Sequence, residues 1–270
     1  MPELPEVENT RRNLVRAGLP GCTITGANIT WANTVKKPLA AELAAGLRDR
    51  TIQDVQRRGK YLILPLSGGG PAAFIVHLGM TGRLRVQPQS QEPDPMTRHF
   101  FPLDDGRELR FVDGRKFGKL WLVDSPNEVL PTMSPEPFDD EFTVETLAES
   151  FAGRKAPLKA LLLEQSVACG LGNLYADESL FLAGLHPERP ASELSVEEIA
   201  RLRQAIIDSL TAAYGVYDRA RDQDWPDPPT ALTTWSHPRD IKAGCPNCGT
   251  NMTAIRVRAR GTFFCAKCQV

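Results

Sequence analysis

Four cysteines near the C-terminus constrain the fold of this chain more than any other feature. They form two Cys-x-x-Cys pairs, Cys245-Pro-Asn-Cys248 and Cys265-Ala-Lys-Cys268, with sixteen residues between the pairs. Two such pairs at this separation are typical of a closed tetrahedral zinc site. Two disulfides or a redox pair are the alternative, which is disfavoured because Cys22 and Cys169 stand alone, as in a cytosolic protein. The pattern predicts one structural Zn²⁺, bound by Cys245, Cys248, Cys265 and Cys268.

A closed zinc site of this kind orders a two-stranded ribbon. The turn between its strands would present Arg256, Arg258 and Arg260. Guanidinium groups bind phosphate oxygens in forks, so the ribbon is expected to contact a phosphate backbone.

Composition bounds the remaining possibilities. The 270 residues suffice for two domains, and 32 basic against 33 acidic residues give a net charge of −1, so composition alone does not indicate a nucleic-acid partner. No apolar run reaches the ~18 residues of a membrane span, and no secretory leader is evident. We therefore expect a soluble, cytoplasmic protein.

The pattern of apolar residues changes along the chain and predicts an α+β protein. A helix over 5–17, between Pro5 and Gly18, precedes strands that suggest a sandwich or barrel. The expected strands are 23–30, 51–66, 72–86, 107–112 and 119–123, with a hairpin turn at Asp105-Gly106 and a mobile loop at 87–97.

The second half reads as helical. One helix face carries Ile199, Leu202, Ile206, Leu210 and Ala213, opened by a capping box from Ser195 to Glu198, and further helices are expected around Leu158 and over 174–183. Residues 216–238 are expected to form a long loop. The predicted domains are 1–130, a Pro-rich linker 131–145, a helical domain 146–238 and the zinc ribbon 239–270.

The first residues offer unusual chemistry. Removal of Met1 would leave Pro2 as a free secondary amine, whose pKa near ~8 leaves a useful neutral fraction. Such an amine can attack an aldehyde carbon and form an iminium, and Glu3 beside it could carry protons. The alternative is an ordinary flexible terminus.

Several internal motifs have both a functional and a structural interpretation. Gly170-Leu-Gly-Asn173 could approach an anion or simply join two helices, and Lys60 could point into a cleft or lie at a solvated strand edge. Met80 could be exposed at a glycine-flanked turn or lie in the core. His99 could donate to a phosphate or be a surface histidine. Arg115 and Phe117 occur together at another turn.

Six motifs, taken together in their order, resemble the bacterial formamidopyrimidine-DNA glycosylase family almost from end to end. They are PELPEVE at the N-terminus, RRGKY, HLGMTG, DGRKFG, GLGN followed by LYADE, and RGTFFC within the four-cysteine ribbon. The resemblance implies an N-terminal β-sandwich or barrel domain with an N-terminal helix. A helical domain with a helix–two-turn–helix and a zinc ribbon would follow.

The resemblance also implies a bifunctional DNA glycosylase and AP lyase. Such an enzyme would excise oxidised purines (8-oxoguanine and formamidopyrimidines) from damaged duplex DNA, form an iminium on Pro2 and cleave the strand by β,δ-elimination. It implies that Glu3 helps to open the sugar, that Lys60 assists elimination, and that Arg260 completes the active-site set by gripping a phosphate. Met80, Arg115 and Phe117 would fill the gap left by the extruded base, while Asn173, Arg154 and His99 would bind the backbone. We expect a monomer associated with the nucleoid.

Two rival hypotheses remain at this stage. An endonuclease VIII-like glycosylase for oxidised pyrimidines typically opens PEGPEI, from which Leu4 and Val7 differ. A non-catalytic zinc-ribbon DNA-binding protein would have no use for Pro2 and Lys60. The chain also departs from the family at Gly114 and Lys116, at Thr97 and in the 216–238 segment, which leaves the preferred lesion open.

Overall fold

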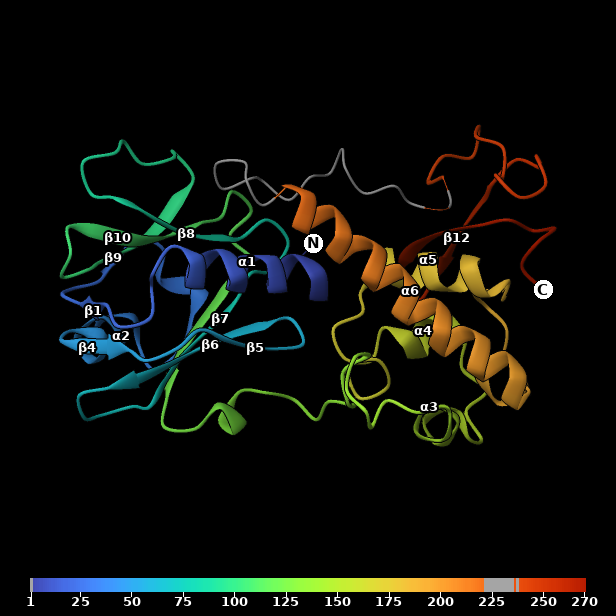
Figure 1. The fold of residues 1–270 in the computed structure, drawn as a ribbon, viewed down its shortest axis with the longest axis horizontal. Helices are drawn as coiled ribbons and strands as arrows, with labels where there is room; N and C mark the ends of the chain where they lie inside the picture. The colour runs from blue at the N-terminus through green and yellow to red at the C-terminus, as the bar shows by residue number, and fades with distance from the viewer. Residues whose placement is uncertain (1, 221–235, 237) are drawn as a thin grey trace. The chain divides into compact units, whose positions relative to one another are not determined.

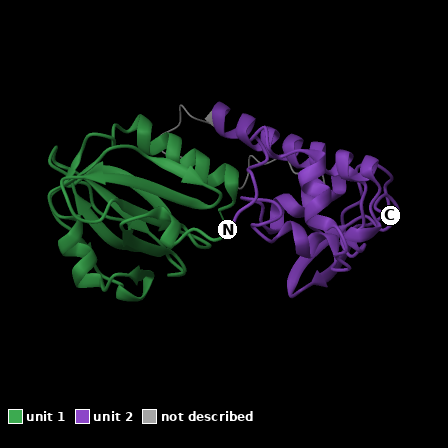
Figure 2. Cartoon of the chain, turned by 90° about the horizontal axis from the view of Figure 1, so that it is seen from below, with its two compact units in different colours: residues 1–131 green, residues 132–270 purple. Residues whose placement is uncertain are grey.

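The computed structural model describes residues 2–220, 236 and 238–270. The chain divides into two compact units, residues 1–131 and 132–270 (Figure 2). In these described ranges, no helix is both long enough and apolar enough to cross a membrane.

Helix α1 (Leu4–Arg16) opens the first unit, within one residue of the predicted bounds (Figure 1). Glu3 is its N-cap, and Pro5 occupies the first turn, where a missing N–H costs nothing. The helix buries Leu4, Val7 and Leu14. It ends at Arg16, and Gly18, just beyond the C-cap Ala17, adopts a φ of 69° that favours glycine.

Two sheets form the rest of the first unit, and the predicted sandwich is confirmed. The larger has the order β1-β4-β6-β7-β11-β3, with β5 paired to β6, and the smaller has the order β2-β9-β10-β8. Phe74 of the larger sheet meets Phe101 of the smaller edge-on, with ring centroids 5.2 Å apart. The strands are β1 (Thr23–Ile24), β2 (Asn28–Ile29), β3 (Val35–Lys37), β4 (Arg50–Ile52), β5 (Gln56–Arg58), β6 (Tyr61–Ser67), β7 (Ala73–His77), β8 (Arg83–Pro88), β9 (Thr97–Pro102), β10 (Arg107–Val112) and β11 (Lys119–Val123).

Strand boundaries differ from the prediction where one apolar run serves two elements. Segment 23–30 divides into β1 and β2, which belong to different sheets, and 51–66 divides into β4, β5 and β6. Helix α2 (Ala40–Leu47), the short 3₁₀ turns Ala32–Thr34 and Pro126–Glu128, and strand β9 were not predicted. The hairpin turn at Asp105-Gly106 does join β9 to β10, and Gly106 has a φ of 82°.

Part of the segment predicted as a mobile loop, 87–97, is held in place by Arg110. This arginine is 1% exposed, and its Nε donates to Glu108 Oε1 at 2.6 Å. Its Nη2 donates to the carbonyl oxygens of Pro88 and Gln91 at 3.2 and 2.7 Å. A buried guanidinium must satisfy its donors, so it ties the start of this segment to the sheet.

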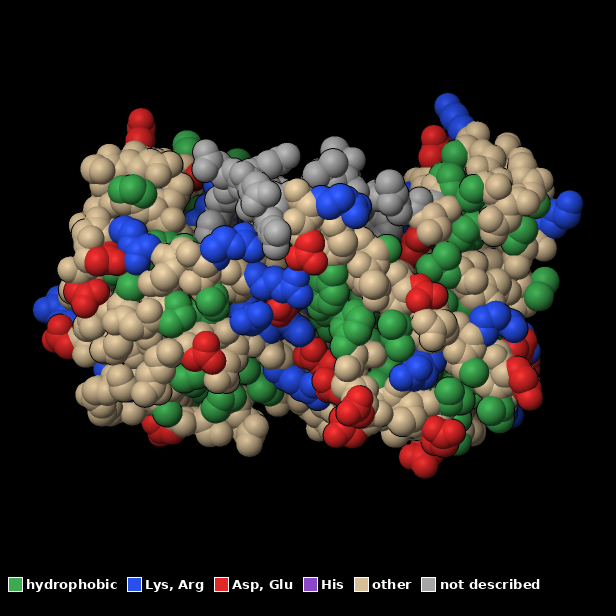
Figure 3. Space-filling model, viewed as in Figure 1, with side chains coloured by type: hydrophobic (Ala, Val, Ile, Leu, Met, Phe, Trp, Pro, Cys, Tyr) green, Lys and Arg blue, Asp and Glu red, His purple; other side chains and the backbone are tan. Residues whose placement is uncertain are grey.

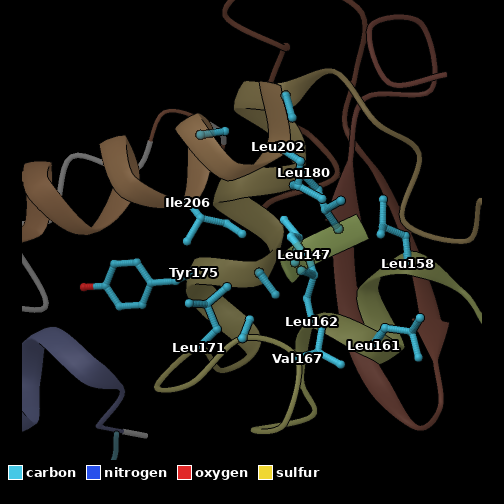
Figure 4. Packing of buried hydrophobic residues seen from close by; sticks show 14 of the residues in the cluster. Leu147, Leu158, Leu161, Leu162, Val167, Leu171, Tyr175, Leu180, Leu202 and Ile206 are labelled. Atoms are coloured by element: carbon cyan, nitrogen blue, oxygen red, sulfur yellow. The ribbon is translucent and has the colours of Figure 1, made fainter. Parts of the chain in front are cut away.

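The second unit is built around helices α3 (Val144–Phe151), α4 (Leu158–Leu162), α5 (Asn173–Ala183) and α6 (Val196–Ala220), with a 3₁₀ turn at Ala191–Glu193. Leu180, Leu202 and Ile206 pack in its core (Figure 4). The predicted capping box is present, because Glu198 N donates to Ser195 Oγ and Ser195 N donates to Glu198 Oε2. Helix α6 extends to Ala220, so residues 216–220 are helical and not the start of a loop. The predicted loop at 221–235 and residue 237 lie outside the described residues.

Most of the predicted linker 131–145 belongs to the second unit. Phe142 is 1% exposed within the helical core, and Ser134 N donates to the carbonyl of Gln165 at 3.0 Å. The prolines and acids of this segment suggested a linker, but the buried Phe142 side chain anchors it.

Strands β12 (Thr253–Val257) and β13 (Arg260–Phe264) form the two-stranded ribbon at the C-terminal end. Phe181 of α5 packs against Cys245, Met252 and Cys265 beside this ribbon. The turn residues Arg258 and Ala259 both have positive φ, of 43° and 63°, as the tightest hairpin turns require.

Candidate active site

Pro2 and Glu3 immediately precede the first residue of α1. Glu3 is 1% exposed, and its N–H donates to Glu6 Oε2 at 2.8 Å, which satisfies one of the donors that a helix start leaves unpaired. Pro2, which precedes it, is half-buried. Pro2 therefore directly precedes a buried glutamate at the start of the helix.

Glu8 ties α1 to the β5–β6 hairpin. Its carboxylate accepts hydrogen bonds from Arg57 Nε at 3.0 Å, Arg11 Nη2 at 2.8 Å and Arg12 Nε at 2.9 Å. Burial opposes ionisation, but the hydrogen bonds from Arg11, Arg57 and Arg12 outweigh it and lower the pKa of Glu8 to about 2. Figure 3 shows basic side chains gathered over the region of α1 and β5.

Lys60 lies at the end of that hairpin. The prediction placed it within a strand, whereas it occupies a two-residue turn, because Arg58 pairs with Tyr61 across it. Gly59 supplies the positive φ of 53° that the turn needs, and its carbonyl accepts from Arg57 Nη1 at 3.2 Å. Lys60 is 9% exposed, so it is a buried lysine and not a solvated edge residue.

His77 lies near Lys60, a neighbour that the sequence argument missed. It pairs with Tyr61 across the sheet, and their rings are 4.9 Å apart. Its Nδ1 accepts from Gly79 N at 3.1 Å, which leaves Nε2 to carry the proton. Burial, with further contributions from the charges of Lys60 and Lys119, lowers the pKa of His77 to about 4, so the ring is a neutral donor. His77 could have been singled out from the sequence, because it is the first residue of the HLGMTG motif.

A buried aspartate joins the two turns that carry Met80, Arg115 and Phe117. Asp113 is fully buried, and its Oδ1 accepts from Thr81 Oγ1 at 2.6 Å and from Arg115 N at 3.2 Å. Its Oδ2 accepts from Gly118 N at 2.8 Å.

The three side chains held by these turns are exposed. Met80 is 37% and Phe117 is 51% exposed, and Arg115 Cζ lies 5.2 Å from the Phe117 ring centroid. Met80, which could also have been a core residue, is a surface residue. We call Met80, Arg115 and Phe117 the wedge residues.

In the second unit, Asn173 and the base of the ribbon turn are joined directly. Asn173 is the first residue of α5, and its Nδ2 donates to the carbonyl of Gly261 at 3.0 Å. Lys159 Nζ donates to the same carbonyl at 3.0 Å. Arg260, next to Gly261, is exposed, as are Arg256 and Arg258. Asn173 and Arg260 are therefore held close together.

Two predicted phosphate contacts have other partners in the structure. Arg154 Nη2 contacts both carboxylate oxygens of Glu164, at 3.0 and 2.9 Å. His99 is fully buried, its Nε2 lies 2.6 Å from Thr34 Oγ1, and its ring stacks on Phe111. Burial, assisted by the charge of Arg98, lowers the pKa of His99 to about 4. His99 is thus neither a surface histidine nor accessible to a phosphate, because its strand turns the ring into the core. Thr97 is buried as well.

The four ribbon cysteines can hold a metal ion. Their sulfur atoms all lie within 4.8 Å of one another, with Cys248 and Cys265 at 3.5 Å and Cys245 and Cys268 at 4.0 Å. Four thiolates at the Zn–S distance of about 2.3 Å would lie about 3.8 Å apart in a tetrahedron. All four are free cysteines, so the alternative of two disulfides is not supported.

Comparisons with known proteins agree with this geometry. Residues 1–120 match the model of the formamidopyrimidine-DNA glycosylase N-terminal domain, and residues 133–219 match the model of the formamidopyrimidine-DNA glycosylase H2TH domain. Formamidopyrimidine-DNA glycosylase of Pelotomaculum thermopropionicum is 39% identical over 100% of this chain and 99% of its own length. That of Symbiobacterium thermophilum is 38% identical, over 100% and 89%.

Solved structures extend the likeness to the fold. The crystal structure of the MutM (Fpg) protein from Thermus thermophilus has a TM-score of 0.85 and 37% identity, covering 99% of this chain and 98% of that one. The Lactococcus lactis Fpg mutant G226P in complex with Fapy-dG-containing DNA has a TM-score of 0.88 and 32% identity, covering 99% of each. With both domain models and full-length relatives in agreement, the chain belongs to the formamidopyrimidine-DNA glycosylase family.

Proposed function

We propose that this chain removes oxidised purines, 8-oxoguanine and formamidopyrimidines, from damaged duplex DNA and then cleaves the strand by β,δ-elimination. As a member of its family it is a DNA glycosylase and AP lyase. The observation that carries the detailed proposal is that α1, which begins beside Pro2 and Glu3, packs on the hairpin that bears the buried Lys60.

In the proposed reaction, Pro2 is the nucleophile once Met1 has been removed. Its nitrogen bonds to C1′ of the damaged nucleotide, the base leaves with the electrons of the glycosidic bond, and the proton that the Pro2 nitrogen loses passes to the departing base. Glu3 supplies the proton needed as the sugar ring opens, which yields an iminium between Pro2 and C1′. With the help of Lys60, loss of a C2′ proton then breaks the C3′–O bond and loss of a C4′ proton breaks the C5′–O bond, so both phosphates leave. Water finally hydrolyses the iminium and releases Pro2.

The remaining predicted residues would bind the DNA. The wedge residues would fill the gap left by the extruded base, and Asn173 and Arg260 would grip adjacent phosphates together. Arg154 would leave its ion pair with Glu164 and bind a phosphate instead. We assign no phosphate contact to His99.

The metal of the ribbon is proposed to be one structural Zn²⁺, held by Cys245, Cys248, Cys265 and Cys268. A bound zinc would supply folding energy to the ribbon and no chemistry. We further propose that residues 146–238 and 239–270 act as two DNA-binding modules, and that the protein acts as a monomer at the cytoplasmic nucleoid, where its substrate lies.

Borohydride reduction on DNA with an abasic site tests this function. The wild-type protein should become covalently trapped, because reduction of the iminium makes the bond to C1′ permanent. Pro2→Gly and a form that retains Met1 should lose trapping and strand cleavage while DNA binding survives. Undiminished trapping by the Met1-retaining form would reject Pro2 and direct attention to Lys60.

A further inference from the structure

Lys116 occupies an uncommon backbone conformation at the centre of the turn that carries Arg115 and Phe117. Its φ is 61°, in the left-handed region that side chains other than glycine rarely adopt. A lysine placed there needs a compensating interaction to keep the turn in this shape.

The Lys116 side chain makes such an interaction with Trp31. Its Nζ lies 3.7 Å from the centroid of the Trp31 ring, well within the range of a cation–π contact. Trp31 immediately precedes the 3₁₀ turn Ala32–Thr34, far from the wedge residues in sequence. The contact therefore ties this turn to the segment at Trp31, in addition to the hydrogen bonds that Asp113 accepts from Arg115 N and Gly118 N.

Trp31 is itself anchored to the core. Its carbonyl oxygen accepts from Thr34 N at 3.2 Å and from Thr34 Oγ1 at 2.8 Å. Since the Thr34 hydroxyl proton points to Trp31, the short contact of 2.6 Å between Thr34 Oγ1 and His99 Nε2 is satisfied when His99 is the donor. The buried His99 thus holds Thr34, and Thr34 holds Trp31.

We propose that Lys116 and Trp31 are positioning residues that keep Arg115 and Phe117 ready to enter the DNA. His99 and Thr34 support this pair from the core. The buried histidine would thus have a structural role in place of a phosphate contact. The inference rests on the wedge role in the proposed function, and it concerns how the wedge is held and not what it does.

A double-substitution cycle tests the pair. The proteins are wild type, Lys116→Met, Trp31→Leu and the double variant, with Arg48→Met as a matched loss of one exposed cation in the same unit. Base extrusion is followed by the fluorescence of 2-aminopurine opposite 8-oxoguanine, and borohydride trapping on abasic DNA is measured in parallel. Each single variant should slow extrusion about 3- to 5-fold, the effect of one partly exposed cation–π contact.

The double variant should be no slower than either single variant, because both remove the same contact. Lys116→Arg and Trp31→Phe should retain most of the rate, and Arg48→Met all of it. Independent, multiplicative losses would overturn the proposal. So would a salt dependence of binding that falls by about 0.9 log units per decade in Lys116→Met, since Lys116 would then contact a phosphate. Failure of the wild type itself to be trapped would instead reject the proposed function.

Discussion

Lys159 Nζ lies 2.6 Å from Asp177 Oδ1, and both side chains are fully buried. The same ammonium group donates to Gly261 O at 3.0 Å and to Thr262 Oγ1 at 2.7 Å. The other oxygen of Asp177 accepts from Arg239 Nη1 at 2.7 Å. The buried pair of Lys159 in α4 and Asp177 in α5 therefore also binds strand β13 of the ribbon, at the residues that follow Arg260.

Removing Lys159 alone should destabilise the second unit severely. Lys159→Met leaves the Asp177 carboxylate buried with its main partner lost, which typically costs about 3–5 kcal/mol. Urea unfolding measures this loss, with Lys155→Met on the exposed neighbour as control. Combining Lys159→Met with Asp177→Leu should recover part of the stability. A small loss in the single variant would show that the pair contributes little.

Because of Glu8, the free energy of unfolding should fall as the solution becomes more acidic. Its folded pKa of about 2 lies below its ordinary value of 4.5, so its contribution is fully present above pH 4.5 and is lost as the pH falls toward 2. A shift of this size corresponds to about 3 kcal/mol. Unfolding measured at pH 7, 4.5 and 3 should show a steep decline in wild type and a shallower one in Glu8→Gln. Glu149→Gln, on an exposed residue of α3, should behave as wild type.

A side chain at position 79 should be poorly tolerated, because the turn that carries Phe117 lies against Gly79. A Cβ at Gly79 would lie 2.5 Å from the Phe117 carbonyl carbon, and φ is 66°. Gly106→Ala is a matched control, because its φ of 82° is equally unfavourable but no atom lies within 4 Å. Gly79→Ala should therefore reduce lesion excision far more than Gly106→Ala does, while trapping on a preformed abasic site falls less. Equal effects in the two variants would mean that backbone strain alone is responsible.

Features that depend on residues close together in the sequence could be predicted, whereas features that depend on tertiary contacts could not. The bounds of α1, the capping box at Ser195 and the cysteine pairs rest on residues a few positions apart, and the structure has all three. The burial of His99 depends on which face of a strand it occupies, and the anchoring by Arg110 depends on a distant loop. The contact between Trp31 and Lys116 joins segments 85 positions apart, so no spacing rule could have indicated it.

The ribbon should separate metal binding from phosphate binding. Cys265 is fully buried among the four sulfurs, so Cys265→Ser should lose the metal and DNA binding together, because so small a unit depends on its metal for folding. Arg260 is exposed and is not one of the four cysteines, so Arg260→Ala should keep one equivalent of zinc, measured by atomic absorption. Its binding to duplex DNA should lose about 0.9 log units of slope per decade of salt, the share of one phosphate contact. Arg48→Ala, an exposed arginine of the other unit, should keep both the zinc and the slope. An unchanged slope in Arg260→Ala would exclude a backbone contact by this residue, and the joint hold of Asn173 and Lys159 on Gly261 would then serve only the packing of the ribbon.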